Sequence, residues 1–146
     1  MKKEEKKIED IKKLKFKNRD LSNMLEALKI LDGIAENGVI VYFDLDERVK
    51  YACIKNKRKL RPLIQDINDA RDSALKALLN PGEEGIEPGD PRMGILMSIT
   101  NAIFEKEEEL DFEFHKFDIT GLNLSKNGKI PSSVIEALEP MLLAEL

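Results

Sequence analysis

The chain has 146 residues, of which 42% are hydrophobic, enough for one domain with a modest core. Its net charge of -4 argues against a general attraction to phosphate backbones or anionic membranes, and its single cysteine excludes a disulfide framework and a multi-cysteine metal site. Because no stretch is apolar enough to cross a bilayer and the first residues are unlike a signal peptide, we expect a cytoplasmic protein without a membrane partner.

The first third of the chain predicts a tail, a strand and a helix. Residues 1–13 are mostly Lys and Glu, so we expect a charged N-terminal tail ahead of a single domain over residues 14–146. Residues 13–17 alternate polar and apolar side chains, as a short strand does. Asn18 and Asp20 can cap the leucine-rich helix that follows, which we expect to end at Gly33.

A connector over residues 33–38 and a short strand over the β-branched and aromatic residues 39–43 come next. Asp44 or Asp46 can then cap a long helix, predicted from about residue 45 to residue 79.

This long helix carries a regular stripe whose members recur in alternating steps of four and three, the spacing of a coiled-coil seam. The stripe consists of Val49, Cys53, Asn56, Leu60, Leu63, Ile67, Ala70, Ala74 and Ala77. We predict that its first six members, Val49 to Ile67, form an interaction seam.

Three residues of this helix need separate interpretation. We expect Cys53 to pack as a small apolar side chain. The polar Asn56 predicts a role in setting helix register or oligomeric state, with an exposed capping or partner contact as the alternative. Pro62 removes a backbone donor, which predicts a kink or a break near Lys59.

A turn-rich loop over residues 80–91 separates this helix from another, in which Leu96, Ile99, Thr100 and Ile103 line one face. We expect the second helix to reach about Glu109 and to form an antiparallel hairpin with the first.

The end of the chain predicts a further strand and a helix. Residues 110–114 alternate as a strand, with a β-bulge at residues 115–116. We expect this strand to pair with residues 13–17, with Lys15 and Lys17 opposite Asp111 and Glu113. The face expected to be buried consists of Leu14, Phe16, Phe112 and Phe114.

A last helix is predicted after Pro131, with Ser133 and Glu136 as a capping box. The predicted fold is therefore a mainly helical α+β domain that combines a long antiparallel helical hairpin, a small antiparallel strand layer and a C-terminal helix.

Four short motifs resemble those of a group of small proteins encoded by tailed phages and prophages. They are Lys15-Phe16-Lys17-Asn18, the run from Ile54 to Leu60, the acidic segment 110–119, and Ala137-Leu138-Glu139-Pro140-Met141. The chain departs from that group at Pro62 and at the proline-rich loop, where a longer polar insert is typical. The resemblance implies a phage accessory or morphogenesis protein, located in the host cytoplasm, and it brings no catalytic residues.

The sharpest chemical feature is the basic run Lys55, Lys57, Arg58, Lys59 and Arg61, whose side chains are possible phosphate contacts. No aromatic platform for base stacking is interleaved with it, so a nucleic-acid-binding regulator is the alternative function and not the first. His115 has no nucleophile placed beside it by any motif, and we interpret it as a solvent-facing side chain.

The sequence assembles no nucleophile, phosphate-cradling glycine loop or metal cluster, so we predict no cofactor, no metal and no enzymatic activity. The function predicted first is helix-mediated interaction with a protein partner or with a second copy of the chain.

Overall fold

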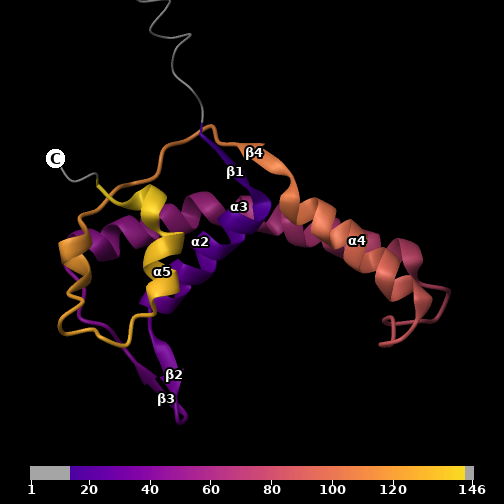
Figure 1. Cartoon of the computed structure of the whole chain (residues 1–146), viewed down its shortest axis with the longest axis horizontal. Coiled ribbons are helices and arrows are strands. Elements are labelled where there is room, and N and C mark those ends of the chain that lie inside the picture. The colour runs from indigo at the N-terminus through magenta and orange to yellow at the C-terminus, as the bar shows by residue number, and fades with distance from the viewer. Residues whose placement is uncertain (1–13, 144–146) are drawn as a thin grey trace, which may run out of the picture.

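The computed structural model describes residues 14–143, and the predicted charged tail of residues 1–13 lies outside them. The described chain is a mainly helical α+β structure, as predicted, and it has two small antiparallel sheets in place of one strand layer (Figure 1). Its elements in chain order are β1 (Lys15–Lys17), α2 (Asn18–Leu31), β2 (Ile34–Glu36), β3 (Val39–Val41), α3 (Glu47–Leu78), α4 (Pro91–Glu105), β4 (Glu107–Glu109) and α5 (Ser132–Ala137), with short 3-10 helices at Ile119–Leu122 and Glu139–Met141.

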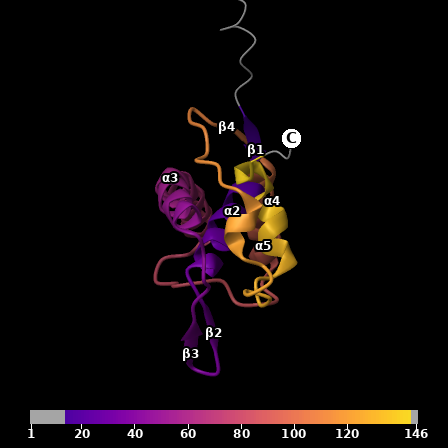
Figure 2. The same ribbon diagram turned by 90° about the vertical axis from the view of Figure 1, so that its left-hand side faces the viewer.

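The core is built around α2, which lies between the first half of α3 and α5 (Figure 2). A helix covered on two sides needs a wide apolar stripe, and half of the fourteen residues of α2 are buried. The segment between β4 and α5 closes the core, with Phe114, Phe117 and Leu122 almost fully buried. Val134 and Leu138 complete it from the C-terminal helix and the residue after it.

Helix α3 runs without interruption through Pro62, so the predicted break near Lys59 is wrong. Pro62 leaves the carbonyl group of Arg58 without its helical partner, and both residues are exposed, so water can take that hydrogen bond. At the start of the helix, the Asp46 side chain accepts a hydrogen bond from the Arg48 backbone N–H at 2.8 Å. Of the two predicted caps, Asp44 and Asp46, the second is therefore the one that caps the helix.

The second half of α3 and α4 pack side by side and project away from the core (Figure 1). We call this part, residues 63–105, the arm. Arg92 closes its far end, because its guanidinium binds the Glu83 carboxylate at 2.7 and 2.8 Å and the Leu78 carbonyl at 2.9 Å. The predicted helical hairpin is thus present, although α4 is shorter than expected.

Helix α4 ends at Glu105 and not at Glu109, and this changes the strand pairing. Three successive acidic residues, 107–109, are unfavourable at the negative end of a helix dipole, and they form β4 instead. Strand β4 pairs antiparallel with β1, with Lys15 opposite Glu109 and Lys17 opposite Glu107. The predicted partners Asp111 and Glu113 were therefore wrong, although each lysine still faces a carboxylate.

The predicted strand over residues 110–114, and with it the bulge at 115–116, does not form. Phe114 is buried and Phe112 is half-buried, and their rings are 5.6 Å apart, so the aromatic side chains pack as expected without a ladder. Leu14, which we expected on the buried face, is 45% exposed. Phe16 is half-buried and contacts the Phe114 ring edge-on.

Two further local predictions need correction. The connector before β3 contains strand β2, and the two strands form a hairpin around Asn37 and Gly38, whose positive φ angles of 52° and 79° suit a two-residue turn. Helix α5 starts after Pro131 as predicted, but it lacks a side-chain cap, so Ser133 and Glu136 form no capping box.

Candidate interaction surfaces

The predicted interaction seam is occupied by the protein's own core over most of its length. Its buried members are Val49, Cys53, Asn56, Leu60 and Ile67, while Leu63 is half-buried. Further along the stripe, Ala70 and Ala77 are exposed and Ala74 is half-buried. The residues we expected to offer to a partner therefore hold α3 against α2 and the C-terminal segment, and a free contact surface has to lie elsewhere.

Asn56 is a clamp on the backbone of a distant segment. Its side-chain oxygen accepts a hydrogen bond from the His115 N–H at 2.7 Å, and its amide nitrogen donates to the His115 carbonyl at 2.9 Å. One side chain thus satisfies both backbone groups of a residue 59 positions away, as a neighbouring strand would. Asn56 is fully buried inside the chain, so the geometry supports neither a role in oligomeric state nor an exposed contact.

Cys53 packs in the core as predicted, at 3% exposure. Burial raises the pKa of its thiol to about 11, because the thiolate would lose its hydration there. At neutral pH the group is a protonated, inert thiol.

Most of the basic run is engaged within the molecule. Lys57 forms an ion pair with Asp32, and only 12% of its side chain is exposed. Lys59 donates to the Glu113 carbonyl and lies over the Phe112 ring.

Three members of the run remain. Lys55 lies 5.4 Å from the centre of the Tyr51 ring, while Arg58 and Arg61 are exposed. Successive residues of a helix are rotated by about 100°, so these three cations, spaced three positions apart, follow one another at about 60° and lie on one side of α3.

His115 is exposed, as expected, and its ring packs edge-on against Tyr51 with 5.0 Å between ring centres. Within residues 14–143 no group of three or more His, Cys, Asp or Glu side chains is arranged to hold a metal ion. None of the described helices combines the length and hydropathy needed to cross a bilayer.

The exposed face of α4 is the most unusual surface of the described chain. From Met93 to Phe104 no residue carries a charge, in a chain of which 36% is charged. Ile95 is 52% exposed and Ile99 is 37% exposed on one flank of this face, and Met97 is 59% exposed on the opposite flank. The exposed residues between the two flanks are small or polar: Gly94, Ser98, Asn101 and Ala102. No residue of α4 is fully buried, because α3 covers only one side of the helix. Of the four residues predicted to line one face of this helix, Leu96, Thr100 and Ile103 are half-buried and Ile99 is exposed. The prediction missed the exposed side, although the uncharged run was visible.

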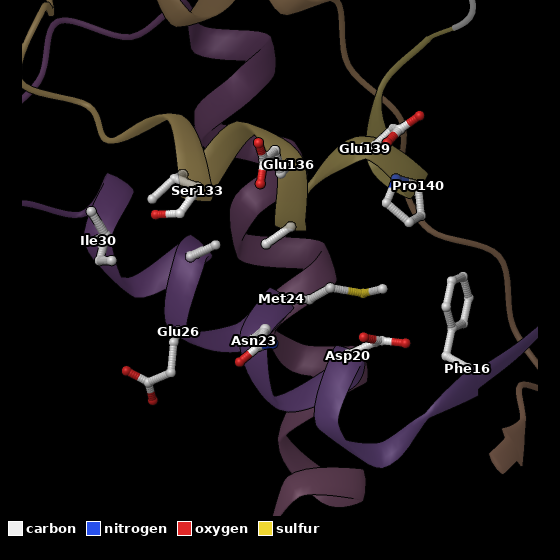
Figure 3. A pocket seen from close by; sticks show the side chains of 13 residues that line it. Phe16, Asp20, Asn23, Met24, Glu26, Ile30, Ser133, Glu136, Glu139 and Pro140 are labelled. Atoms are coloured by element: carbon white, nitrogen blue, oxygen red, sulfur yellow. The ribbon is translucent and has the colours of Figure 1, made fainter. Parts of the chain in front are cut away.

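A second surface is the groove between α2 and α5, with a volume of about 850 Å³ (Figure 3). Its apolar lining comes from both helices and includes Met24, Ala27, Val134 and Ala137. Phe16 and Pro140 lie at one end and Ile30 lies toward the other (Figure 3).

The rim of this groove is acidic on both sides. Asp20 and Glu26 project from α2, and Glu136 and Glu139 project from α5 and the 3-10 helix after it. Among residues 14–143, no lysine, arginine or histidine lines the groove. Within the part of the chain that the structure describes, Glu26 is the only one of the four in an ion pair, an exposed one with Lys29. We refer to this surface as the acidic groove.

Comparisons with protein-family models, with curated proteins and with solved structures found no match for this chain. A proposal for its function therefore depends on these surfaces and on the sequence.

Proposed function

We propose that the protein is a non-enzymatic accessory or morphogenesis protein of a phage or prophage, and that it acts by helix-mediated protein–protein interaction through the outer face of α4. The phage origin is supported by the sequence resemblance alone. The mode of action is supported by one observation above all, the uncharged and exposed run from Met93 to Phe104 on the arm.

An outer face of this composition is costly in a free molecule. Burying the exposed part of apolar side chains stabilises a complex by roughly 25 cal/mol per Å². Surface helices of globular proteins normally avoid the cost by carrying charged residues on the solvent side, as the second half of α3 does with Asp66, Asp69 and Asp72. The contrast between the two helices of the arm favours α4 as the contact surface.

A second copy of the chain is the partner that this face fits most simply. In a twofold symmetric dimer the same patch lies on both sides of the interface, so a charged patch would meet its own charge. The stretch from Met93 to Phe104 carries no charge, so two copies of it would not repel each other. Gly94 adds room for close approach, since a Cβ atom added there would meet nothing within 4 Å. We therefore propose self-association through paired arms.

The test measures molar mass by light scattering over a wide range of protein concentration. We expect a dimer or larger species whose fraction grows with concentration. Replacing both Ile95 and Ile99 by lysine should give a monomer with unchanged helical circular dichroism, because neither side chain is in the core.

The matched control is Ile54→Lys, which changes an isoleucine of α3 that is 47% exposed and lies outside the arm. This variant should associate like the unmodified chain. A monomer at every concentration would contradict the proposal. So would an equal loss of association in the arm variant and in the control.

The geometry gives less support to the alternative function, a nucleic-acid-binding regulator. Lys57 and Lys59 are held by acceptors of the same chain, which leaves Lys55, Arg58 and Arg61 on one side of α3, and Lys55 lies against the Tyr51 ring.

A further inference from the structure

The acidic groove has a shape and a charge that specify an occupant. Its floor is apolar and its rim carries carboxylates on both walls, so a matching segment presents apolar side chains bordered by cations. Both walls are formed largely by helices, which present no strand edge. Recognition here therefore depends on side chains, and strand addition is excluded as a binding mode.

The chain itself contains a segment of this chemistry. Residues 1–13 hold six lysines against four acidic residues, a net charge of +2, whereas the whole chain carries -4. Their apolar members include Ile8 and Ile11, which are three positions apart and would share one side of a helical turn.

The segment also ends at the groove. Residue 13 is three positions before Phe16, which lines the groove, so a contact between the two is intramolecular. Short covalent connections of this kind give effective concentrations in the millimolar range. A weak electrostatic and apolar contact, too weak to hold a separate peptide, is then sufficient.

We infer that residues 1–13 dock in the acidic groove of the same chain, with lysines against the rim carboxylates and Ile8 and Ile11 toward the floor. This inference is independent of the proposed dimer, because α4 contributes nothing to the groove.

The experiment uses the full chain with a nitroxide spin label at position 5, introduced as Glu5→Cys, and with ¹³C-labelled methionine methyl groups. Cys53 is buried and its thiol pKa is raised to about 11, so at neutral pH the label reacts with the new cysteine alone. The Met24 methyl reports on the groove, and Met97 on the arm is the control within the same molecule.

We expect the Met24 signal to lose intensity relative to the sample with the reduced label, while the Met97 signal keeps its intensity. The loss should disappear in 1 M salt, where the screening length falls to about 3 Å. It should also disappear when Glu136 and Glu139 are both replaced by lysine. The control Glu84→Lys changes an exposed acidic residue in the loop between α3 and α4. In this variant the loss of Met24 intensity should remain.

The measurements are repeated in the Ile95→Lys, Ile99→Lys background, so that failure of the proposed dimer does not affect them. Equal intensities of Met24 and Met97 would overturn the inference. A loss of comparable size when spin-labelled chains are mixed with separate ¹³C-labelled chains would overturn the assignment to the same chain and place the segment in the groove of a second copy.

Discussion

Replacing Asn56 tests whether its side chain works as a backbone clamp or as a determinant of association. In Asn56→Leu the branched shape of the side chain is kept with a larger volume, but the N–H and the carbonyl of His115 lose their partners. Each hydrogen bond contributes about 1 kcal/mol net, and a buried group left unpaired costs about 1–3 kcal/mol. We expect the free energy of unfolding to fall by about 2–4 kcal/mol.

Asn56→Asp separates the two hydrogen bonds and adds a pH signature. Its carboxylate can still accept from the His115 N–H, but its second oxygen faces the His115 carbonyl, where only a protonated carboxyl can donate. Burial and this repulsion raise the pKa of the new carboxyl in the folded state above its unfolded value of about 3.9.

The sign of the effect follows from proton binding. The folded variant binds a proton more tightly than the unfolded chain, so its stability rises as the pH falls through the folded pKa and levels off below about 3.9. Each unit of the difference corresponds to about 1.4 kcal/mol. The penalty relative to the unmodified chain should therefore be largest at pH 7 and shrink toward pH 4.

Urea unfolding followed by circular dichroism between pH 4 and pH 7 measures these differences, with Asn68→Asp as the control. Asn68 is an exposed asparagine of the same helix, and its replacement should change the stability by no more than about 0.5 kcal/mol. A leucine variant that keeps its stability but changes its molar mass would refute the clamp and restore the association role. An aspartate penalty that does not vary with pH would refute the assigned geometry.

Two further predictions concern glycines and the end of the arm. A Cβ atom at Gly121 would lie 2.5 Å from a methyl carbon of Val49, so Gly121→Ala should destabilise the chain by about 1–3 kcal/mol in urea unfolding. Gly94 is in open space within its own chain, so in the monomeric Ile95→Lys, Ile99→Lys background Gly94→Ala should stabilise the chain by about 0.5–1 kcal/mol. The Arg92 hydrogen bonds lower the pKa of the Glu83 carboxyl from 4.5 to about 2, so this contact stabilises the loop above pH 4.5 and loses its effect as the pH falls toward 2. In an NMR titration Arg92→Ala should raise the Glu83 midpoint toward its ordinary range, while the remaining hydrogen bond from the Asn80 N–H keeps it somewhat lower; an unchanged midpoint would show that Arg92 does not set it.

The helices were predictable where the pattern is local. The stripe from Val49 to Ile67 and the Asp46 cap locate α3 to within two residues of its observed start, because they depend on neighbours along the chain. The same pattern gave no way to tell which molecule covers the stripe. Most of its side chains are buried within the described chain, so they leave little surface for a second molecule.

The strands were harder to place, because their register depends on where another element ends. The lysines of β1 face Glu107 and Glu109 since α4 stops at Glu105, and no periodicity within residues 13–17 indicates that. The β2–β3 hairpin is different. Asn37-Gly38 is a strong two-residue turn signal, and it was available in the sequence.

The contact between Asn56 and His115 could not be predicted, since it joins residues 59 positions apart through one amide. The acidic groove likewise combines side chains of α2 with those of the C-terminal region, and only the packing of these helices brings them together.

Because α3 continues through Pro62, one helix sets the distance from the core to the tip of the arm. At a rise of about 1.5 Å per residue its 32 residues extend over about 48 Å, with one end in the core and the other at the tip of the arm. A continuous helix of this kind acts as a stiff spacer. Whatever is bound along α4 is held at a constant distance and direction from the body of the protein, and in an assembly of several copies this one helix would determine the spacing of the subunits.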